Sequence, residues 1–424
     1  MEIVFMAGGR GTRIASVNSE IPKPMLPILG KPVLEYGIEC IRNQGYTDIT
    51  IVIGYLGHII KNYFGDGFNW GVSIQYIEEK VPLGTAGALY YMRDRLSDDF
   101  LLINGDIIFD IDIKRMHCYH NMHKGIATIL THPNDHPYDS GIIIADQDGC
   151  VQDWLHKESE RLWYQNRVNA GIHILSPQIF DKTYSLYHSL KKMDLDRDVL
   201  KPLISKKKLF AYNSSEYVKD MGTPDRLIQV SKDIQSGKVE AKNLRKKQRA
   251  VFLDRDGTIN KYVGFLKDID DFELLPGVGE AIRNMNALGY LVIVISNQPV
   301  IARGEVSEKE LSKIHNKMET LLGKKGAYID AIYYCPHHPD KGYVGERVEL
   351  KIDCNCRKPK PGMILQAAKD FNIDLSKSWM VGDSETDVVS GERAGCKTVY
   401  LGNQEKKYGQ LYTFESLQEV CSIL

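Results

Sequence analysis

The sequence predicts an α/β protein of two domains, each with a sheet whose faces are covered by helices. Two observations support this fold class. Apolar runs of strand length alternate with helical patterns along the 424 residues. In addition, a short apolar run leads directly into a Gly- or Asp-rich turn at two places, after residues 3–6 and after residues 250–253. Such turns are typical of the carboxyl ends of parallel strands, where α/β folds bind ligands.

The two turns divide the chain into a first domain at residues 1–235 and a second at 249–424, joined by a linker at 236–248. The linker is polar, basic and poor in core residues, which is typical of a solvated connector. Nucleic-acid binding is the alternative for a basic run. The net charge of −1 provides no general attraction for a polyanion. We therefore expect no nucleic-acid partner.

Apolar segments predict the strands of both domains, and the patterns between them predict helices. In the first domain, strands are expected at residues 2–6, 49–53, 72–77, 100–103, 126–131 and 170–175, and helices at 33–44 and 86–96. In the second, strands are expected at 250–253, 291–295, 331–334, 379–381 and 397–401, and helices at 277–288 and 308–322.

Composition is that of an ordinary globular protein, with 43% apolar and 26% charged residues. The chain opens directly into an apolar strand without a basic leader, and no stretch has the roughly 18 uncharged apolar residues that a membrane span needs. We therefore expect a cytoplasmic protein with no membrane partner. A homo-oligomer is compatible with the sequence.

A glycine-rich loop follows the first strand. Gly8, Gly9 and Gly11 lie within six residues, and Thr12 and Arg13 complete the loop. Glycine lets backbone amides approach a polyphosphate, and arginine can neutralise charge that develops on it. An ordinary tight turn is the alternative for such a loop taken alone.

A lysine fixed between prolines strengthens the nucleotide interpretation. Lys23 follows the loop by ten residues, and the prolines on either side stiffen the backbone that presents its ammonium group. The pattern is neither a Walker loop, which needs Gly-Lys-Ser/Thr, nor a dinucleotide fingerprint.

Three further motifs fit a metal-dependent attack on a nucleotide. Gly84, Thr85 and Gly87 form a small-residue turn that suits close packing against a base or ribose. Asp106 follows the strand at 100–103, and Asp220 supplies a second carboxylate far away in the sequence. Two carboxylates and nucleotide phosphates suit Mg²⁺. Each aspartate alone is equally typical of a turn or a helix cap.

Residues 1–235 resemble the sugar-1-phosphate nucleotidyltransferase family through Gly-Gly-x-Gly-Thr-Arg at 8–13 and Pro-Lys-Pro-Met-x-Pro at 22–27. The resemblance implies a Rossmann-like domain with a mixed sheet. It implies attack of a sugar 1-phosphate oxygen on the α-phosphorus of a nucleoside triphosphate, without a covalent enzyme intermediate. The implied roles are phosphate stabilisation by Arg13 and Lys23, base contact by Gly87, Mg²⁺ binding by Asp106 and Asp220, and sugar-phosphate binding by Lys157, Asn169 and Gly171.

The sequence around these motifs narrows the resemblance. Residues 20–28 and 30–36 are most similar to the branch that makes GDP-heptose from heptose 1-phosphate, which implies GTP and a heptose phosphate as substrates. The family usually has a glutamate immediately before the lysine that contacts the sugar phosphate, and this chain has His156 there.

The second domain carries an ordered set of motifs at strand ends and loops. Asp254 and Asp256 follow the strand at 250–253, and Ser296 follows the next predicted strand. Lys358 lies in a later basic loop, and Asp383 follows the strand at 379–381. One carboxylate at such an edge can attack phosphorus while another transfers protons. A calcium loop also begins with Asp-x-Asp, but its further ligands are absent from this sequence.

This order resembles the haloacid dehalogenase superfamily over residues 249–402. The resemblance implies that Asp254 is a nucleophile that forms an aspartyl phosphate and that Asp256 is the general acid and base. It implies that Ser296 and Lys358 hold the phosphoryl group. The implied Mg²⁺ site involves Asp254, Asp256, Asp383 and Asp387, the last of which orients the cluster.

Three cysteines and a histidine form a further cluster. Cys335, Cys354 and Cys356 lie within 22 residues, beside His337. Three sulfurs and an imidazole make the closed tetrahedral set that structural Zn²⁺ prefers. Reduced, unliganded cysteines are the alternative. Zinc here would fix the loop that delivers Lys358 and would have no chemical role of its own.

The same cluster resembles two phosphatase families, those for heptose 1,7-bisphosphate and for histidinol phosphate. The long insert between His337 and Cys354, and the sequence at 301–304, favour the heptose family, although Pro299-Val300 stands where it commonly has Ser-Gly. The resemblance implies a substrate site formed by Tyr262, Gly264, Phe265, Asn297, Gln298, Arg303 and Arg357.

Two alternatives to a heptose pathway enzyme stay open. The first joins a mannose- or other hexose-1-phosphate nucleotidyltransferase to a histidinol-phosphate-type phosphatase. In the second, one half is a regulatory module without catalysis. The full set of motif residues in both halves argues against the second alternative.

Overall fold

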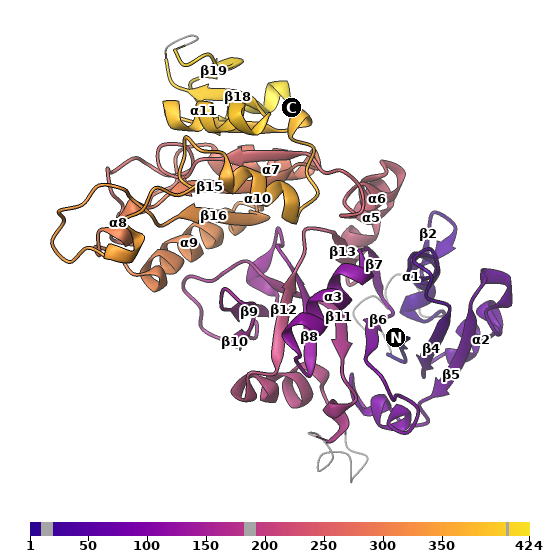
Figure 1. The fold of residues 1–424 in the computed structure, drawn as a ribbon. Helices are drawn as coiled ribbons and strands as arrows, with labels where there is room; N and C mark the ends of the chain where they lie inside the picture. The colour runs from indigo at the N-terminus through magenta and orange to yellow at the C-terminus, as the bar shows by residue number, and fades with distance from the viewer. Residues whose placement is uncertain (10–19, 182–191, 404–406) are drawn as a thin grey trace. The chain divides into compact units, whose positions relative to one another are not determined.

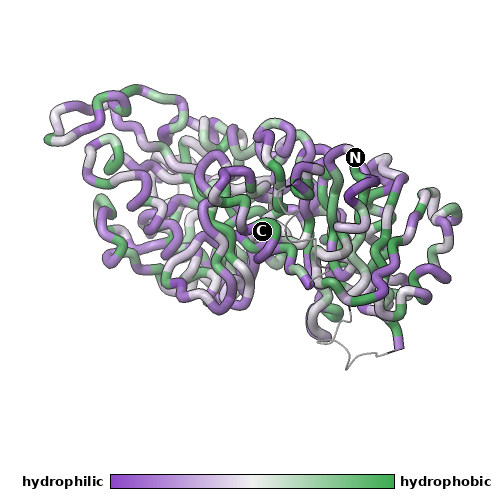
Figure 2. Tube along the Cα trace, turned by 90° about the horizontal axis from the view of Figure 1, so that it is seen from below, coloured by the Kyte–Doolittle hydropathy of each residue, from purple (hydrophilic) through white to green (hydrophobic). Residues whose placement is uncertain are grey.

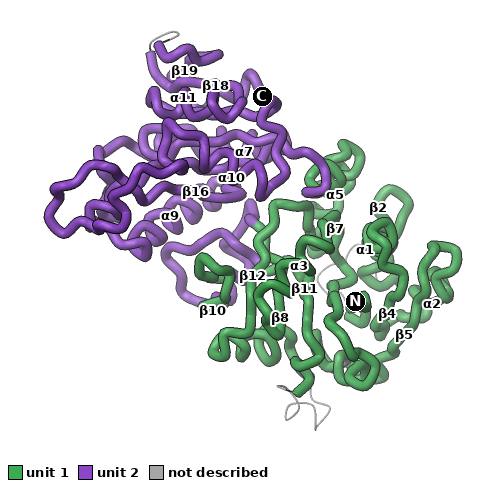
Figure 3. The backbone as a smooth tube through the Cα atoms, viewed as in Figure 1, with its two compact units in different colours: residues 1–132, 143–154, 169–243 green, residues 133–142, 155–168, 244–424 purple. Residues whose placement is uncertain are grey.

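The computed structural model describes residues 1–9, 20–181, 192–403 and 407–424. The chain forms two compact units (Figure 3). Unit 1 comprises Met1–His132, Ile143–Trp154 and Asn169–Asn243, and unit 2 comprises Pro133–Ile142, Leu155–Val168 and Leu244–Leu424. Both units are α/β, as predicted. Two short segments from the first 235 residues are therefore part of unit 2.

Unit 1 is built on a mixed sheet of nine strands (Figure 1). β1 pairs in parallel with β4 and β6, whereas β11 runs antiparallel to β6. The order along the main path is β10-β9-β11-β6-β1-β4-β5, with β8 paired to β11 and β12 paired to β8. The strands are β1 (Glu2–Ala7), β4 (Asp48–Ile53), β5 (Ser73–Glu78), β6 (Phe100–Asn104), β8 (Ala127–His132), β9 (Ile142–Ala145), β10 (Val151–Leu155), β11 (Val168–Leu175) and β12 (Leu209–Asn213).

Two small strand pairs and several helices complete unit 1. β7 (Ile107–Asp110) pairs antiparallel with β13 (Tyr217–Asp220), and β2 (Pro27–Ile28) pairs with β3 (Lys31–Pro32). In α1, the apolar side chains recur at helical spacing and face the core. The helices are α1 (Val33–Arg42), α2 (Gly57–Phe64), α3 (Ile113–His123), α5 (Pro224–Gln235) and α6 (Lys238–Ala241).

The helix expected at residues 86–96 is wrong as an α-helix. The structure has a 3₁₀ helix at Gly87–Met92 instead. Ala86, Leu89 and Met92 are all fully buried, and a spacing of three places successive side chains directly above one another in a 3₁₀ helix. The hydrogen bond from Leu89 N to Ala86 O (3.0 Å) has this spacing.

Unit 2 is built on six parallel strands in the order β16-β15-β14-β17-β18-β19. β14 (Ala250–Leu253) lies in the middle, with β15 (Leu291–Asn297) on one side and β17 (Trp379–Gly382) on the other. The chain therefore changes direction across the sheet between β14 and β17, which is where parallel sheets bind ligands. The remaining strands are β16 (Ala331–Cys335), β18 (Lys397–Leu401) and β19 (Tyr412–Phe414).

Helices flank this sheet. Two of them, α7 (Val278–Ala287) and α9 (Glu308–Gly323), lie where helices were predicted, at residues 277–288 and 308–322. α9 begins with a capping box, in which Ser307 and Glu310 bond each other's backbone amides. The others are α8 (Pro299–Ala302), α10 (Gly362–Asp370), α11 (Glu385–Ala394) and α12 (Leu417–Val420). Among the helices of the described residues, each is too short or too polar to cross a membrane.

Both sheets bury both faces. Ile3 and Phe5 of β1 belong to one core cluster and Val4 to another. Val251 and Phe252 of β14 are divided in the same way between two clusters. Strands that are buried on both faces are continuously apolar, which explains why these runs could be found in the sequence. In Figure 2, hydrophobic residues (green) form runs along the chain trace between hydrophilic stretches (purple).

The solvated connector expected at residues 236–248 is wrong in its middle part. Val239 of α6 packs in a core cluster of unit 1. Asn243 is 1% exposed and donates to Asp110 Oδ1 (2.7 Å), and Leu244 is 4% exposed. The isolated apolar residues in this basic run are therefore core residues.

Candidate active sites

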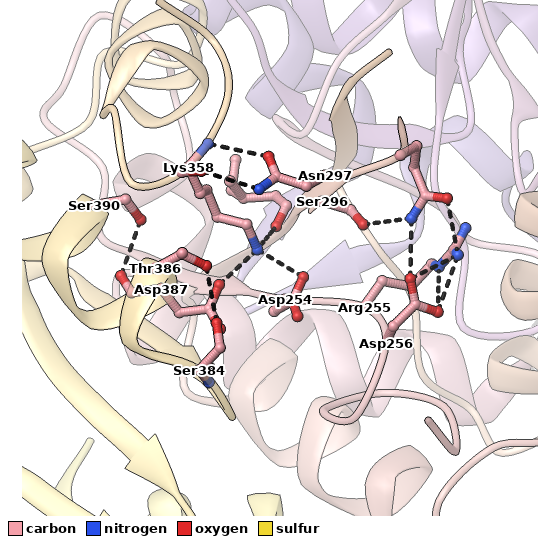
Figure 4. A network of polar contacts seen from close by, with 12 residues as sticks. Asp254, Arg255, Asp256, Ser296, Asn297, Lys358, Ser384, Thr386, Asp387 and Ser390 are labelled. Carbon is pink, nitrogen blue, oxygen red and sulfur yellow. Dashed lines mark hydrogen bonds and ion pairs between the residues drawn. The ribbon is translucent and has the colours of Figure 1, made fainter. Parts of the chain in front are cut away.

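The carboxyl edge of the unit 2 sheet brings together the predicted phosphatase residues (Figure 4). Lys358 Nζ lies 2.7 Å from Asp254 Oδ1 and 2.6 Å from Asp387 Oδ1, and it donates to Ile295 O at 2.8 Å. Asn297 fixes the backbone of Lys358 through its side-chain amide, with bonds of 3.0 and 3.1 Å. The lysine therefore enters the site as a rigidly held cation.

Asp256 is held by a second set of contacts. Arg255 NH2 donates to both carboxylate oxygens of Asp256, at 2.9 and 2.8 Å. Asn260 Nδ2 donates to Oδ1 at 3.0 Å, and Gln298 Nε2 donates to Oδ2 at 3.0 Å. Gln298 Nε2 also donates to Ser296 Oγ at 2.7 Å, so the predicted phosphate-binding hydroxyl belongs to the same network.

The two aspartates have different electrostatic environments. Burial raises the pKa of Asp254 to about 7, with Lys358 opposing the rise and Asp387 adding to it. Burial also acts on Asp256, but Arg255 and its other donors outweigh it and hold the pKa of Asp256 below its ordinary value. Burial lowers the pKa of Lys358, yet Asp254 and Asp387 raise it more, so the lysine stays charged. Separate environments of this kind allow two carboxylates to take different roles.

Three carboxylates at this edge could hold a metal ion. Ligand oxygens of Asp254, Asp383 and Asp387 lie within 4.8 Å of one another. Burial and the neighbouring Asp387 raise the pKa of Asp383 to about 6. Lys358 is the cation paired with Asp254 and Asp387, so the three carboxylates together keep a net negative charge. Carboxylate oxygens are hard ligands, which Mg²⁺ prefers. Asp256, predicted as a fourth ligand, lies outside this set, and its carboxylate pairs with Arg255.

A cavity of about 340 Å³ opens over these residues. Arg303 lies beside it, stacked between Phe265 and Tyr343, with its guanidinium 3.9 and 4.4 Å from the two ring centroids. Arg357 is anchored by a hydrogen bond to His337 O (3.3 Å). The lining includes the predicted substrate residues Tyr262, Gly264, Phe265, Asn297, Gln298 and Arg357.

The cysteine and histidine cluster is assembled in space as a zinc site requires. The three sulfur–sulfur distances among Cys335, Cys354 and Cys356 are 3.1, 3.2 and 3.4 Å. His337 Nδ1 lies 3.3 Å from Cys356 Sγ and 3.7 Å from Cys335 Sγ. A tetrahedron with zinc–sulfur bonds of about 2.3 Å has edges of about 3.8 Å, so the sulfurs would have to separate slightly to hold the ion. All four ligands come from protein, so the site fits a structural Zn²⁺.

In unit 1, the predicted phosphate and metal residues meet beside β7 and β13. Lys23 Nζ contacts Asp106 Oδ2. The β7–β13 pairing brings Asp220 close to Asp106, and Met221 N donates to Asp106 O at 2.9 Å. Arg226 pairs with Asp220 at 2.5 Å and, against the effect of burial, holds the pKa of that carboxyl below its ordinary value. Two carboxylates beside a lysine fit the predicted Mg²⁺ and phosphate site.

Part of the glycine-rich loop lies outside the described residues, including the predicted Gly11, Thr12 and Arg13. Gly8 and Gly9 directly follow β1. A side chain at Gly8 would meet the carboxylate of Glu79, which therefore lies directly against the loop. Glu79 Oε1 is buried and has no hydrogen-bond partner among the described residues. Burial raises the pKa of Glu79.

The small-residue turn predicted to contact the base is fixed by its backbone. Gly84 has φ +85°, and a side chain there would overlap the backbone of Met193. Thr85 Oγ1 accepts from Leu195 N at 2.7 Å. Gly87 begins the 3₁₀ helix that replaces the predicted helix start.

Two of the predicted sugar-site residues lie together on β11. Gly171 N donates to Asn169 Oδ1 at 3.0 Å. Gly171 has φ +74°, and Asn104 occupies the place that a side chain would take. Asn169 Nδ2 contacts Asp196 at 3.3 Å, and burial raises the pKa of Asp196 to about 7. Lys157 belongs to the segment 155–168 of unit 2, and its role in the sugar site stays a prediction.

Sequence analysis missed several residues of these sites. Arg255 could have been noticed as the residue between two predicted catalytic aspartates, and Arg226 as a basic residue six positions after Asp220. Glu79 and Asp196 carry no sequence signal, because only the fold brings them to Gly8 and Asn169.

Comparison with protein families gives a match in each half of the chain. A nucleotidyl transferase family model matches residues 2–237, and a HAD-hydrolase-like model matches residues 355–416. A Bacillus anthracis crystal structure assigned as a glucose-1-phosphate thymidylyltransferase superposes with a TM-score of 0.50 at 23% identity, covering 55% of this chain and 94% of that one. This last likeness concerns the fold alone.

Curated relatives match the second half. The D-glycero-β-D-manno-heptose-1,7-bisphosphate 7-phosphatase of Pasteurella multocida is 44% identical over 184 residues, which cover 42% of this chain and 97% of the relative. The D-glycero-α-D-manno-heptose-1,7-bisphosphate 7-phosphatase of Burkholderia mallei is 44% identical over 155 residues, or 37% of this chain and 80% of the relative.

Proposed function

Because the chain belongs to the nucleotidyl transferase family through residues 2–237 and to the heptose-1,7-bisphosphate 7-phosphatase family through its second half, we propose that it performs two consecutive steps of GDP-heptose synthesis. The chain is both a nucleotidyltransferase and a phosphatase. The first step removes the 7-phosphate of D-glycero-D-manno-heptose 1,7-bisphosphate. The second transfers GMP from GTP to the resulting heptose 1-phosphate and releases pyrophosphate.

One observation carries this proposal. The relatives of the second half are named for removing the phosphate at position 7 of a sugar 1,7-bisphosphate. The product of that reaction keeps its phosphate at position 1. A sugar 1-phosphate is the substrate class that the resemblance of the first half implies. The same relatives favour heptose 1,7-bisphosphate over histidinol phosphate as the phosphatase substrate.

In the proposed phosphatase step, Asp254 attacks phosphorus and forms an aspartyl phosphate, while Asp256 gives a proton to the departing sugar oxygen. Water then attacks the aspartyl phosphate, and Asp256 takes up the proton. Lys358 and Ser296 hold the phosphoryl oxygens. Asp254, Asp383 and Asp387 would hold Mg²⁺, which supplies further charge neutralisation when bound. Asp256 has to take up a proton before it can act as the acid, because Arg255 and its other donors hold its pKa below the ordinary value.

In the proposed transfer step, an oxygen of heptose 1-phosphate displaces pyrophosphate from the α-phosphorus of GTP. Lys23 neutralises phosphate charge, and Asp106 and Asp220 are the residues that would hold Mg²⁺. Arg13 is proposed to stabilise the transferring group. Asn169 and Gly171 are proposed to bind the sugar. Positioning and charge neutralisation provide the rate enhancement, because no covalent intermediate with the protein forms.

Glu79 supports guanine as the base. Its carboxylate lies against Gly8 of the nucleotide loop, and its Oε1 has no partner among the described residues. Guanine presents two neighbouring donors, N1–H and N2–H₂, which a carboxylate can accept together. Adenine presents an acceptor at N1 and would face the carboxylate with its lone pair. The guanine edge is therefore the better complement to Glu79.

The purified protein tests the proposal directly. Incubation with heptose 1,7-bisphosphate, GTP and Mg²⁺ should release phosphate and pyrophosphate and yield GDP-heptose. Both anomers of the bisphosphate should be supplied, since the relatives include enzymes named for each. Mannose 1-phosphate, other hexose 1-phosphates and histidinol phosphate serve as competing substrates. Absence of phosphate release, or faster turnover of the competing substrates, would contradict the proposal.

A further inference from the structure

Two segments that the nucleotidyl transferase family model covers are structural parts of unit 2. They are Pro133–Ile142 and Leu155–Val168, which we call the clasp. The match with the Pasteurella phosphatase covers 42% of this chain and 97% of that relative, and residues 244–424 alone are about 43% of the chain. A stand-alone relative therefore has little length left for a counterpart of the clasp.

The clasp packs on α9 through buried polar contacts. Tyr164 N donates to Thr320 Oγ1 at 2.9 Å, and the same hydroxyl donates to Tyr164 O at 3.2 Å. Arg167 NH1 forms an ion pair with Glu319 Oε1 at 3.1 Å. Arg167 is 7% exposed and Glu319 is 2% exposed. The ion pair and the Tyr164–Thr320 hydrogen bonds between the clasp and α9 are therefore buried.

Arg167 has further partners that define its orientation. NH1 also donates to Asn166 O at 2.7 Å, and NH2 donates to Asp330 O at 3.4 Å. A buried ion pair contributes little net stability, because desolvation offsets its attraction. A position of α9 that separated the two partners would leave a charge unpaired in the interior, which is costly. The pair therefore favours one position of α9 without adding much to the stability of the fold.

The helix that the clasp fixes also contacts the proposed catalytic residues. His315 precedes Glu319 by four residues, so the two side chains lie on the same side of α9, one turn apart. His315 Nε2 accepts from Arg255 NH1 at 3.3 Å, and both side chains are buried. The other end of the Arg255 guanidinium binds Asp256 and Gln298. A displacement of α9 would therefore move the donor that orients Asp256.

We propose that Arg167 and Glu319 are positioning residues for the phosphatase reaction: they hold α9 in place, so that His315 keeps Arg255 aligned on Asp256. This inference rests on the proposed phosphatase function. It makes a residue from the transferase half of the sequence part of the support of the phosphatase site. Neither residue touches the substrate, so their effect passes through His315.

A double-mutant cycle in the full chain tests this route. Glu319→Gln removes the charge that holds Arg167, and His315→Leu removes the contact with Arg255. We expect each variant to lower phosphatase kcat about tenfold, within the roughly 100-fold or more that general acid–base catalysis provides, with KM changed less than twofold. The double variant should be no slower than His315→Leu alone, because both changes interrupt one route.

A matched control lies on the same helix. Glu308 of α9 pairs with Arg347 at 3.5 Å, and both side chains are about 40% exposed. Glu308→Gln removes the same charge from α9 at an exposed pair, and it should leave phosphatase kcat unchanged. The control separates the loss of a specific contact from a general change in the charge of the helix.

Three results would overturn the inference. They are multiplicative losses in the double variant, a change confined to KM, or wild-type kcat in Glu319→Gln. If Glu319→Gln does not fold, Arg167→Met/Glu319→Met replaces it, since an apolar pair of similar length leaves no buried charge. That variant should fold with a cooperative thermal transition, yet show the same loss of kcat. A wild-type protein without phosphatase activity would instead contradict the proposed function.

Discussion

The two candidate sites are built in different ways. In unit 2, each reactive side chain is held by other side chains: Lys358 by Asp254 and Asp387, and Asp256 by Arg255. In unit 1, Lys23 and Asp220 also form ion pairs, with Asp106 and Arg226, but the described site has glycines as well, at positions 8, 84 and 171, where a side chain would meet a neighbouring residue. Both sites therefore concentrate charge, and the glycines of unit 1 also leave room for a ligand. Substitutions of the charged residues should abolish activity in either unit, whereas substitutions beside the glycines of unit 1 should alter nucleotide selectivity.

Removal of the proposed nucleophile should have the largest effect. Asp254→Asn keeps the size of the side chain but cannot form an aspartyl phosphate, so phosphate release should fall by about 10⁴-fold or more. Nucleotidyl transfer from supplied heptose 1-phosphate should stay within twofold of wild type. Phosphate and pyrophosphate release, measured on the same preparation, compare the two sites. Unchanged phosphate release would remove Asp254 from the mechanism.

Replacement of the buried lysine should damage both activity and stability of unit 2. Lys358→Met leaves Asp254 and the fully buried Asp387 without their cation, which should cost about 3–5 kcal/mol of unfolding free energy. Lys360→Met is the control, because Lys360 pairs with the exposed Asp353 and should contribute less than about 1 kcal/mol. Denaturant unfolding monitored in both variants gives the comparison. An equal loss of unfolding free energy in the two variants would mean that Lys358 stabilises the buried carboxylates no more than Lys360 stabilises an exposed one.

Loss of the metal cluster should have an intermediate effect. Metal analysis should find one Zn²⁺ per chain bound by Cys335, His337, Cys354 and Cys356. Cys356→Ser should release it and lower phosphatase kcat by about 10–100-fold, because Cys356 is two residues from Lys358 in the sequence. Cys118→Ser changes an exposed cysteine of unit 1 and should alter neither quantity. A zinc-free wild type with full activity would rule out the structural role.

A change in base selectivity should be the smallest effect. Glu79→Gln replaces one acceptor oxygen with a donor, so it should reduce the preference for GTP over ATP by about 10–100-fold, the value of one paired hydrogen-bond contact to a base edge. Glu78→Gln alters the neighbouring, exposed residue of β5 and serves as the control. Ratios of kcat/KM for the two nucleotides measure the effect. An unchanged ratio would show that Glu79 does not contact the base.

Most of the fold could be predicted because both sheets are buried on both faces. The strands of β1, β14 and their neighbours are therefore nearly pure apolar runs, and their ends mark the sites. The segment 86–96 was harder, because buried residues three apart resemble part of a helical pattern in the sequence. The residues that orient Asp256 follow partly from sequence, since Arg255 is adjacent, but His315 reaches it only through folding.

The clasp also bears on how the two activities could be separated in the laboratory or in evolution. A gene cut near residue 243 would assign residues 133–142 and 155–168 to one product and their binding surface on α9 to the other. Each fragment would then expose a face that the intact chain keeps covered. The two halves of the gene therefore cannot be exchanged independently. A recombination that replaced one half would have to supply a matching partner for Arg167 or Glu319.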